Sequence, residues 1–179
     1  MTQAAKVYGE SMYELALSEG LSGEILEEMK VIRTLFQENP DYIHLLSEPS
    51  IPGKERTDLI ETAFGNQAER YLVNFLKLLC ERNLLREFGG CCEEYLRRYN
   101  RDNGIAEAIV TSAVPLTDVQ AEALKQKLET LSGKKISLTR KTDPSLLGGV
   151  RVELEGKELD GTVKGRLNGL SRKLDSLTL

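Results

Sequence analysis

Residues 143–167 read DPSLLGGVRVELEGKELDGTVKGRL, and this stretch decides how the second half of the chain folds. It opens with a turn at 143–145 and a glycine pair at 148–149, after which apolar and polar residues alternate as they do in a strand. A second turn at 155–157 predicts another short strand, and Asp160 stands where a helix can begin. The stretch holds no nucleophile paired with a base and no set of metal ligands. It therefore predicts shape and docking rather than catalysis.

The residues around this stretch predict a small domain in which a helix separates the first two strands. Thr117 is expected to cap that helix, and Gln120 three residues later completes a capping box. The expected order is β-α-β-β-β-α, which indicates an α+β domain with a small mixed or antiparallel sheet. The elements are a strand at 105–114, a helix at 117–131, a strand at 135–139, two short strands within 143–160 and a helix at about 162–177.

The residues before Asn103 have helical periodicity throughout. Apolar residues recur every three or four positions, and the runs end at glycine, proline or asparagine. Ser22 is expected to cap the second helix, and Pro52 fits the first turn of the fourth, where a missing N–H costs little. The predicted helices cover about 5–20, 22–38, 42–46, 52–64, 67–82 and 85–101.

The sequence as a whole predicts two domains. Residues 1–103 are expected to form an N-terminal all-α six-helix bundle, and residues 104–179 a small α+β C-terminal domain. The connections between the predicted helices are short, so neighbouring helices are expected to pack antiparallel. The expected boundary lies near residues 102–104.

The composition excludes several functional classes. Hydrophobic residues make up 40% of the chain and charged residues 29%, which is ordinary for a globular protein and too apolar for a disordered one. Residues 1–103 hold 12 Lys and Arg against 18 Asp and Glu, so they lack the basic face that nucleic acid requires. No apolar run approaches the roughly 20 residues of a membrane span, and no signal peptide is evident. Three cysteines without CxxC spacing predict reduced thiols in a cytosolic protein.

The candidate catalytic residues of the sequence lack the partners that catalysis requires. His44 is the only histidine, and Asp41 and Glu48 lie about one helical turn on either side of it, so we expect surface charge pairing. The glycine pair quoted above precedes a strand, whereas the glycines of a phosphate-binding loop follow a strand and lead into a helix. The adjacent glutamates at 27–28 and 93–94 splay apart on their helices and are expected to face solvent. We therefore expect no catalytic residue, no cofactor and no metal site.

Two predicted helices carry more apolar residues than one buried face needs. The first has Val7, Tyr13 and Leu17 outside its main apolar face, and the fifth has Tyr71 and Leu78 outside its own. Two apolar stripes are explained either by a helix that is surrounded on all sides or by a second face kept for a partner helix. The main faces comprise Ala5, Tyr8, Met12, Leu15 and Ala16 in the first helix, and Leu72, Phe75, Leu76 and Leu79 in the fifth.

The last predicted helix has glycine at every fourth position, at Gly161, Gly165 and Gly169. Each interior glycine costs about 1 kcal/mol relative to alanine, so a packing reason is expected. Either the helix packs closely on the sheet, or the glycines form a groove for a partner helix.

With these features assembled, the chain resembles the delta subunit of bacterial F-type ATP synthase, the counterpart of the mitochondrial oligomycin sensitivity-conferring protein. The resemblance covers nearly the full length. Gly9 and Ser11 stand where the family has alanine, and ERNLL at 81–85 replaces its Glu-Asn-x-Arg-Leu pattern. The substitutions at 9 and 11 keep the side chains small, so a close helix approach survives. The matching motifs are YGESMYELA at 8–16, NFLKLL at 74–79, SAVPLT at 112–117, DPSLLGG at 143–149 and DGTVKGRL at 160–167.

The resemblance implies a static linker in the stator of the synthase. Family members bind the N-terminal helix of an alpha subunit in a groove between their first and fifth helices, and their second domain engages the C-terminal ends of the peripheral-stalk b subunits. Carried onto this sequence, the alpha-subunit site comprises Tyr8, Ser11, Met12, Leu15, Tyr71, Phe75 and Leu78. The b-subunit site comprises Gly165, Arg166, Gly169 and Lys173.

The resemblance also implies how the protein is deployed. It predicts a role in ATP synthesis and proton transport without an active site of its own, in one copy per complex and not as a homo-oligomer. The expected location is the cytoplasmic face of the cell membrane, held through the complex, with no direct membrane insertion and no nucleic acid. The alternative that the residues leave open is a stand-alone helical adaptor for another amphipathic helix.

Overall fold

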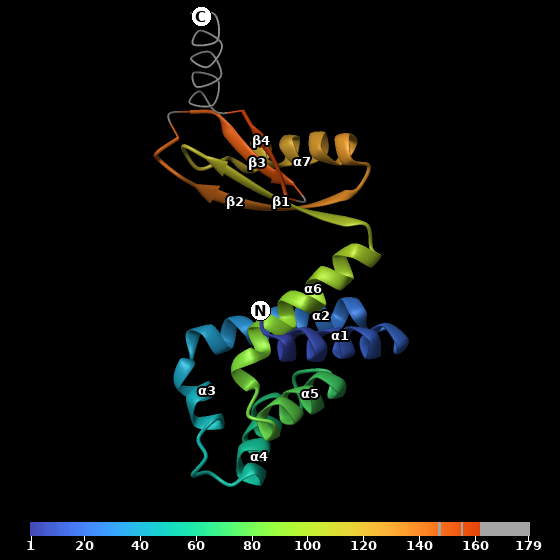
Figure 1. The fold of residues 1–179 in the computed structure, drawn as a ribbon, viewed down its shortest axis with the longest axis vertical. Helices are drawn as coiled ribbons and strands as arrows, with labels where there is room; N and C mark the ends of the chain where they lie inside the picture. The colour runs from blue at the N-terminus through green and yellow to red at the C-terminus, as the bar shows by residue number, and fades with distance from the viewer. Residues whose placement is uncertain (147, 155, 162–179) are drawn as a thin grey trace, which may run out of the picture. The chain divides into compact units, whose positions relative to one another are not determined.

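A computed structural model describes residues 1–146, 148–154 and 156–161 of the chain (Figure 1). The chain divides into two compact units, residues 1–99 and 100–179. The division falls in the last turn of a helix, α6 (Phe88–Asp102). Helices make up the described part of the first unit, and a sheet with one helix makes up most of the second. None of the described helices is both long and apolar enough to cross a membrane.

The helical elements of the first unit match those expected from periodicity, with changes at their ends. Ser22 does not cap the second helix, because it is the first helical residue and the cap position falls to Leu21, which makes no side-chain bond. Pro52 lies at the cap position of the fourth helix, one residue before the first turn. The elements are α1 (Gln3–Ser18), α2 (Ser22–Glu38), α3 (Pro40–Leu46), α4 (Gly53–Phe64), α5 (Arg70–Glu81), a short 3-10 turn η1 (Leu85–Glu87) and α6.

These helices enclose one apolar core, to which all of them contribute. Tyr13 of α1 meets Tyr95 of α6 edge to face, with ring centroids 5.3 Å apart. Phe36 of α2 meets Phe88 of α6 in the same way at 5.4 Å. Such pairs add about 0.5–1.5 kcal/mol to the burial of their apolar surface. The three cysteines are unbridged and buried in this core.

The departure at 81–85 has a structural role in this chain. Asn83 adopts a left-handed backbone conformation (φ 54°), which asparagine tolerates better than most residues. Its side-chain oxygen accepts a hydrogen bond from Arg56 Nη1 at 2.9 Å, and the same nitrogen donates to Leu46 O at 3.1 Å. Arg56 is 8% exposed. The buried guanidinium thus ties the end of α3 to the turn that follows α5.

The second unit contains a four-stranded mixed sheet in the order β2-β1-β3-β4. The central strand β1 (Ile105–Ser112) pairs in parallel with β2 (Lys135–Thr142) and antiparallel with β3 (Val150–Leu154), and β3 forms a hairpin with β4 (Lys157–Asp160). A parallel neighbour requires a crossover, which α7 (Asp118–Ser132) supplies. The described part is therefore an α+β fold, as the sequence predicted.

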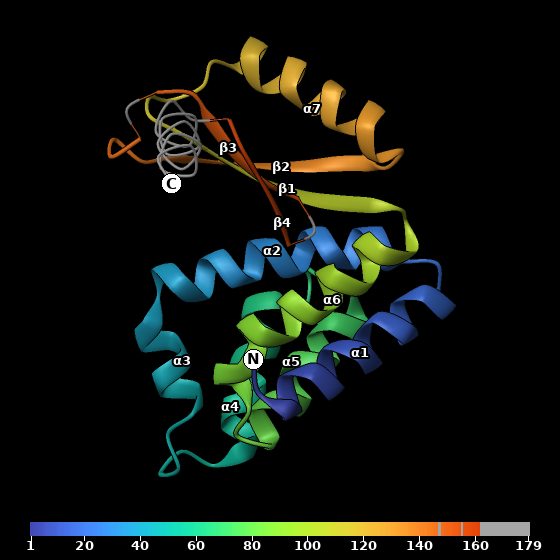
Figure 2. The same ribbon diagram turned by 45° about the horizontal axis from the view of Figure 1, so that its top comes forward.

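Helix α7 lies along one face of the sheet (Figures 1 and 2). The predicted capping box is present: Thr117 Oγ1 accepts from Gln120 N at 3.3 Å, and Gln120 Oε1 accepts from Thr117 N at 3.0 Å. The helix ends at Gly133, whose φ of 68° is left-handed. Even-numbered residues of β1 face the helix, and the core consists of Ala106, Ala108, Val110, Leu128, Ile136 and Val152.

The stretch 143–161 forms the expected turns and strands in its described residues. Asp143 Oδ1 accepts from Ser145 N at 2.9 Å, which closes the first turn. Gly149 has a φ of 81°, so glycine is needed where the chain enters β3. The glycine pair forms a turn before a strand, as predicted, and does not form a phosphate-binding loop. The helix expected at 162–177 lies outside the described residues.

Two predictions about charged residues are wrong. Glu94 does not face solvent: it is 1% exposed and forms ion pairs with Arg97 and Arg98. Helical spacing correctly places Glu93 and Glu94 on different faces of α6. It does not show that α1 covers the face that carries Glu94. His44 is exposed, and in the described part of the chain it forms no ion pair with Asp41 or Glu48.

Candidate helix-binding groove

An apolar groove of about 410 Å³ runs between α1 and α5 in the first unit. Residues spaced three and four apart face it from each helix, because this spacing places side chains on one side of a helix. Met12 and Phe75 form its floor, at 2% and 7% exposed. The lining residues are Val7, Tyr8, Ser11, Met12 and Leu15 from α1, and Tyr71, Asn74, Phe75 and Leu78 from α5.

The two apolar stripes on each helix now have separate assignments. The stripe of α1 that faces the core comprises Ala5, Gly9, Met12, Tyr13 and Ala16. Tyr13 therefore belongs to the core, which corrects its placement outside the main face, while Leu15 belongs to the groove. Helix α5 is divided in the same way, with Leu72, Leu76 and Leu79 fully buried. Neither helix is surrounded on all sides by described residues.

The walls of the groove expose apolar surface to solvent. Val7 is 47% exposed, Leu15 39% and Leu78 38%. Single exposed apolar residues are common, but three around one hollow with an apolar floor form a patch that a partner can desolvate. Ser11 is the small polar residue between them, and its hydroxyl donates to Val7 O at 3.0 Å within the helix. The small Ser11 side chain leaves the hollow above Met12 and Phe75 unfilled.

Tyr71 lines the groove from the first turn of α5. A hydrogen bond between its hydroxyl and the Glu19 side chain, at the end of α1, raises the pKa of Tyr71. This interaction brings the start of α5 close to the end of α1.

A polar hollow of about 380 Å³, lined by residues of α4 and α5, adjoins the groove. Asn74 lines both, and Arg70 and Lys77 lie one turn away from it on either side. Lys77 is paired with Glu61 of α4, whereas Arg70 has no ion-pair partner in the described part of the chain. The flank along α5 therefore offers hydrogen bonds and positive charge to whatever occupies the groove.

All seven residues predicted for this site line the one groove: Tyr8, Ser11, Met12, Leu15, Tyr71, Phe75 and Leu78. Val7 and Asn74 also line it and were not predicted. Asn74 lies three residues after Tyr71 and four before Leu78, so helical spacing places it on the same face. The four residues predicted for the second site, Gly165, Arg166, Gly169 and Lys173, lie outside the described residues.

The described side chains contain no group of three or more His, Cys, Asp or Glu side chains that could hold a metal ion. Burial raises the pKa values of Cys91 and Cys92 to about 12, so both are poor nucleophiles at neutral pH. Apolar contact and shape are what the groove offers.

The sequence profile of the ATP synthase delta (OSCP) subunit family matches residues 4–174. The chain belongs to this family. The resemblance seen in the motifs is thereby confirmed, and the family is that of a structural component of ATP synthase. The ATP synthase subunit delta of Lachnoclostridium phytofermentans is 30% identical over 176 residues, which are 98% of this chain and 97% of that protein. The ATP synthase subunit delta of a Synechococcus species is 29% identical over 177 residues, which are 97% of each chain.

A solved structure shares the fold of this delta (OSCP) family member. One chain in the cryo-EM structure of the Toxoplasma gondii mitochondrial ATP synthase hexamer superposes with a TM-score of 0.73. The superposition covers 97% of this chain and 98% of that chain. Sequence identity is 13%, so the likeness concerns the fold alone.

Proposed function

We propose that this protein is a non-catalytic stator subunit of F-type ATP synthase. It links the catalytic head to the peripheral stalk of the membrane sector, so that torque from the rotor drives ATP synthesis and not rotation of the head. Its first unit acts as a six-helix bundle that binds the N-terminal helix of an alpha subunit. Membership of the delta (OSCP) family supports the assignment to the synthase.

The observation that carries the proposal is the apolar groove between α1 and α5. Its lining residues repeat at helical spacing on both walls, so an amphipathic helix can lie along it with its apolar face on Met12 and Phe75. The docked helix would bury the exposed parts of Val7, Leu15 and Leu78. Arg70 and Asn74 would then meet the polar edge of the helix, where Arg70 favours a carboxylate.

A stator holds by binding, so its mechanism is mechanical. An interface under torque must dissociate slowly, and a well-packed desolvated apolar centre is what slows dissociation in protein interfaces. The groove supplies such a centre through Met12 and Phe75, with a polar flank along α5. No proton transfer or covalent step is required of this chain, and we expect the isolated protein not to turn over nucleotides.

The second unit is proposed to bind the C-terminal ends of the b subunits. The residues assigned to this contact are Gly165, Arg166, Gly169 and Lys173, outside the described part of the chain. In this account residues 1–103 serve the alpha subunit and residues 104–179 serve the stalk. One copy joins each complex and lies at the cytoplasmic face of the cell membrane through its partners.

The second candidate function is a stand-alone adaptor that binds a different amphipathic helix in the same groove. The exposed apolar walls of the groove, taken alone, would support the adaptor function as well as they support the stator function. The two functions are separated by the identity of the helix that binds. A peptide covering the alpha-subunit N-terminus binds under the first proposal and does not bind under the second.

Isothermal titration of the full chain with that peptide tests the proposal. We expect binding to the unmodified protein and at least a roughly tenfold weaker affinity for Ser11→Asp, because a carboxylate would be desolvated in the apolar groove. Thr34→Asp is the matched control: Thr34 is exposed on α2, and its hydroxyl donates to Lys30 O at 3.0 Å as Ser11 does to Val7 O.

The control variant should bind as the unmodified chain does, and circular dichroism should show both variants folded. If the peptide binds a known delta subunit but not this chain, the stator proposal is wrong. If Ser11→Asp binds with unchanged affinity, the helix docks on a different face.

A further inference from the structure

Strand β2 is an outer strand of the sheet, and no described strand pairs with its far side. Two bonds at its ends show which residues bond inward. Lys135 N donates to Gly104 O at 3.1 Å, and Asp143 N donates to Ser112 O at 2.9 Å. Residues of a parallel strand send their backbone groups alternately to one neighbour and the other. Odd-numbered residues therefore bond to β1, and even-numbered residues turn their backbone groups outward.

One of the outward backbone amides, that of Ile136, bonds to a side chain. Ile136 N donates to Glu129 Oε1 of α7 at 3.1 Å. The outward backbone groups of Leu138 and Arg140 follow along the strand, and neither residue's backbone bonds to a side chain of the described residues. The strand contains no proline, no glycine and no bulge to block pairing. It is an open template for an added strand.

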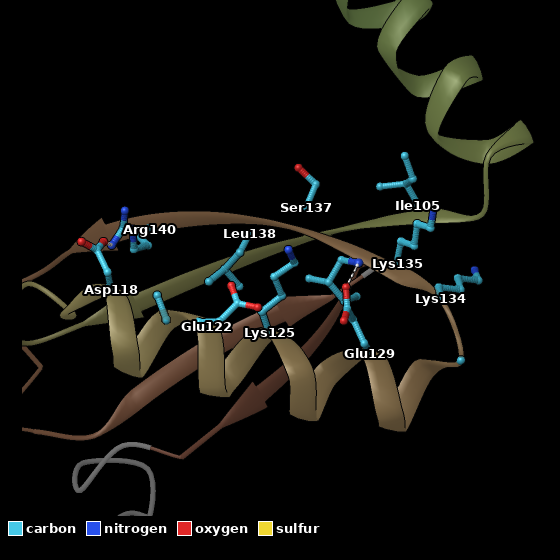
Figure 3. A pocket seen from close by; sticks show the side chains of 13 residues that line it. Ile105, Asp118, Glu122, Lys125, Glu129, Lys134, Lys135, Ser137, Leu138 and Arg140 are labelled. Atoms are coloured by element: carbon cyan, nitrogen blue, oxygen red, sulfur yellow. Dashed lines mark hydrogen bonds and ion pairs between the residues drawn. The ribbon is translucent and has the colours of Figure 1, made fainter. Parts of the chain in front are cut away.

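There is room for that strand. A hollow of about 1050 Å³ lies between β2 and α7, over Ala121 and Leu138. Figure 3 shows Glu122 and Lys125 of α7 lying across from Leu138, while Asp118 and Arg140 close one end as an ion pair at 2.7 Å. An extended segment beside β2 would direct every second side chain into this hollow. Small apolar side chains suit those positions.

The other side chains of an added strand would meet a positive face. Lys135 and Lys141 extend from the face of β2 opposite α7, with Ser137 and Thr139 between them and no acidic residue on the strand. Neither lysine forms an ion pair in the described part of the chain. Opposite charges on neighbouring strands attract, and like charges repel. An occupant with acidic residues about six positions apart would pair with both lysines.

We propose that the outer edge of β2 binds an extended acidic segment of another polypeptide, which joins the sheet as a fifth strand. A second copy of this chain fits poorly, because pairing β2 with β2 would place lysines beside lysines. The opposite edge, β4, carries Glu158 and Asp160 against Lys157, so charge selects β2 for an acidic segment. The site is separate from the groove between α1 and α5 and does not depend on it.

The test uses the full chain and an acetylated, amidated heptapeptide of sequence EVTVTVE, whose two glutamates are six positions apart. We expect a dissociation constant of about 100 µM, typical of a short segment held mainly by backbone bonds. NMR should place the largest shift changes on β2, with slower hydrogen exchange of the Leu138 and Arg140 amides. The peptide KVTVTVK should bind about tenfold more weakly, and EVTPPVE should not bind, because either proline interrupts the new ladder.

Charge reversal on the protein gives the second arm. The double variant Lys135→Glu and Lys141→Glu should prefer KVTVTVK over EVTVTVE, and Lys157→Glu on β4 is the matched control that should keep the original preference. Absence of EVTVTVE binding, shift changes centred on β4, or equal binding of the acidic and basic peptides would each overturn the proposal. Dimerisation of the unmodified chain through β2 would overturn it too, because the occupant would then be a second copy. If the double variant fails to fold, the comparison of EVTVTVE with EVTPPVE on the unmodified chain still tests the proposal, because equal binding of the two peptides would exclude an added strand.

Discussion

Glu94 is a buried carboxylate in α6. Its carboxylate accepts from Arg97 Nη2 at 2.6 Å and from Arg98 Nε at 2.8 Å, and Arg98 also pairs with Glu10 of α1. The hydrogen bond from Arg97 lowers the pKa of Glu94 to about 2, with help from Arg98 and against the effect of burial. The network joins α1 to α6 directly behind the groove wall.

This carboxylate predicts a pH dependence of stability. Its folded pKa lies below its ordinary value of 4.5, so its contribution is complete above about pH 4.5 and is lost as the pH falls toward 2. We expect Glu94→Gln to cost about 2 kcal/mol of unfolding free energy at pH 7 and much less at pH 3. Urea denaturation at the two pH values measures the difference.

The neighbouring residue provides the control for that measurement. Glu93 is exposed, and its pair with Arg33 has an N–O distance of 2.9 Å, so Glu93→Gln should cost no more than about 0.5 kcal/mol at either pH. An equal loss for Glu94→Gln at pH 7 and pH 3 would show that the charge of Glu94 does not stabilise the unit.

Helices α1 and α6 approach each other closely at Gly9. A Cβ there would lie 2.6 Å from Cys91 O and 3.0 Å from Glu94 Cβ. The family pattern has alanine at this position, and the small residue was expected to preserve close packing. The structure goes further, because in this chain the contact leaves no space for even a methyl group. The position of the α1 wall of the groove thus depends on a glycine.

The close approach predicts that Gly9→Ala is destabilising despite the better helix propensity of alanine. We expect a loss of about 2 kcal/mol in unfolding free energy, because α1 must move away from the α6 backbone. Gly89→Ala in α6 is the matched control: its Cβ would meet nothing within 4 Å, so it should be neutral or stabilising by up to about 1 kcal/mol. Equal effects of the two changes in chemical denaturation would contradict the close contact.

Periodicity showed a second apolar stripe on the first and fifth helices, but it left open whether each helix is surrounded or keeps a face for a partner. The set of groove residues, Leu15 and Leu78 among them, came from the family resemblance. Periodicity could not assign Tyr13 to the core, because its burial depends on packing against the Tyr95 ring, which is 82 residues away in the sequence. The burial of Glu94 was missed for the same reason. Helical spacing shows which residues share a face, but the neighbouring helix decides which face is buried.

The ends of elements were also set by contacts distant in sequence. Strand β2 continues to Thr142, beyond the predicted end at 139, because β1 offers it a complete ladder from Ile105 to Ser112. The capping box at Thr117 was predictable because both partners lie within four residues. Hydrogen bonds between residues close in sequence can be predicted from their spacing, whereas the extent of pairing between two strands cannot.

At the scale of the whole molecule, we propose that each unit binds a different partner. The helical unit offers an apolar groove for one helix, and the sheet unit offers a basic strand edge in addition to the contact assigned to the b subunits. Under this proposal the protein needs strong binding at both ends and no catalytic step of its own.

The most direct test of the linking role is ATP-driven proton pumping by synthase reconstituted in vesicles from components that lack this chain. Adding the unmodified protein should attach the catalytic head through the stalk and restore pumping, and Thr34→Asp should do the same. Ser11→Asp at equal concentration should restore much less, because its groove no longer holds the alpha-subunit helix. Full pumping without the chain, or equal restoration by Ser11→Asp and the unmodified protein, would contradict the account.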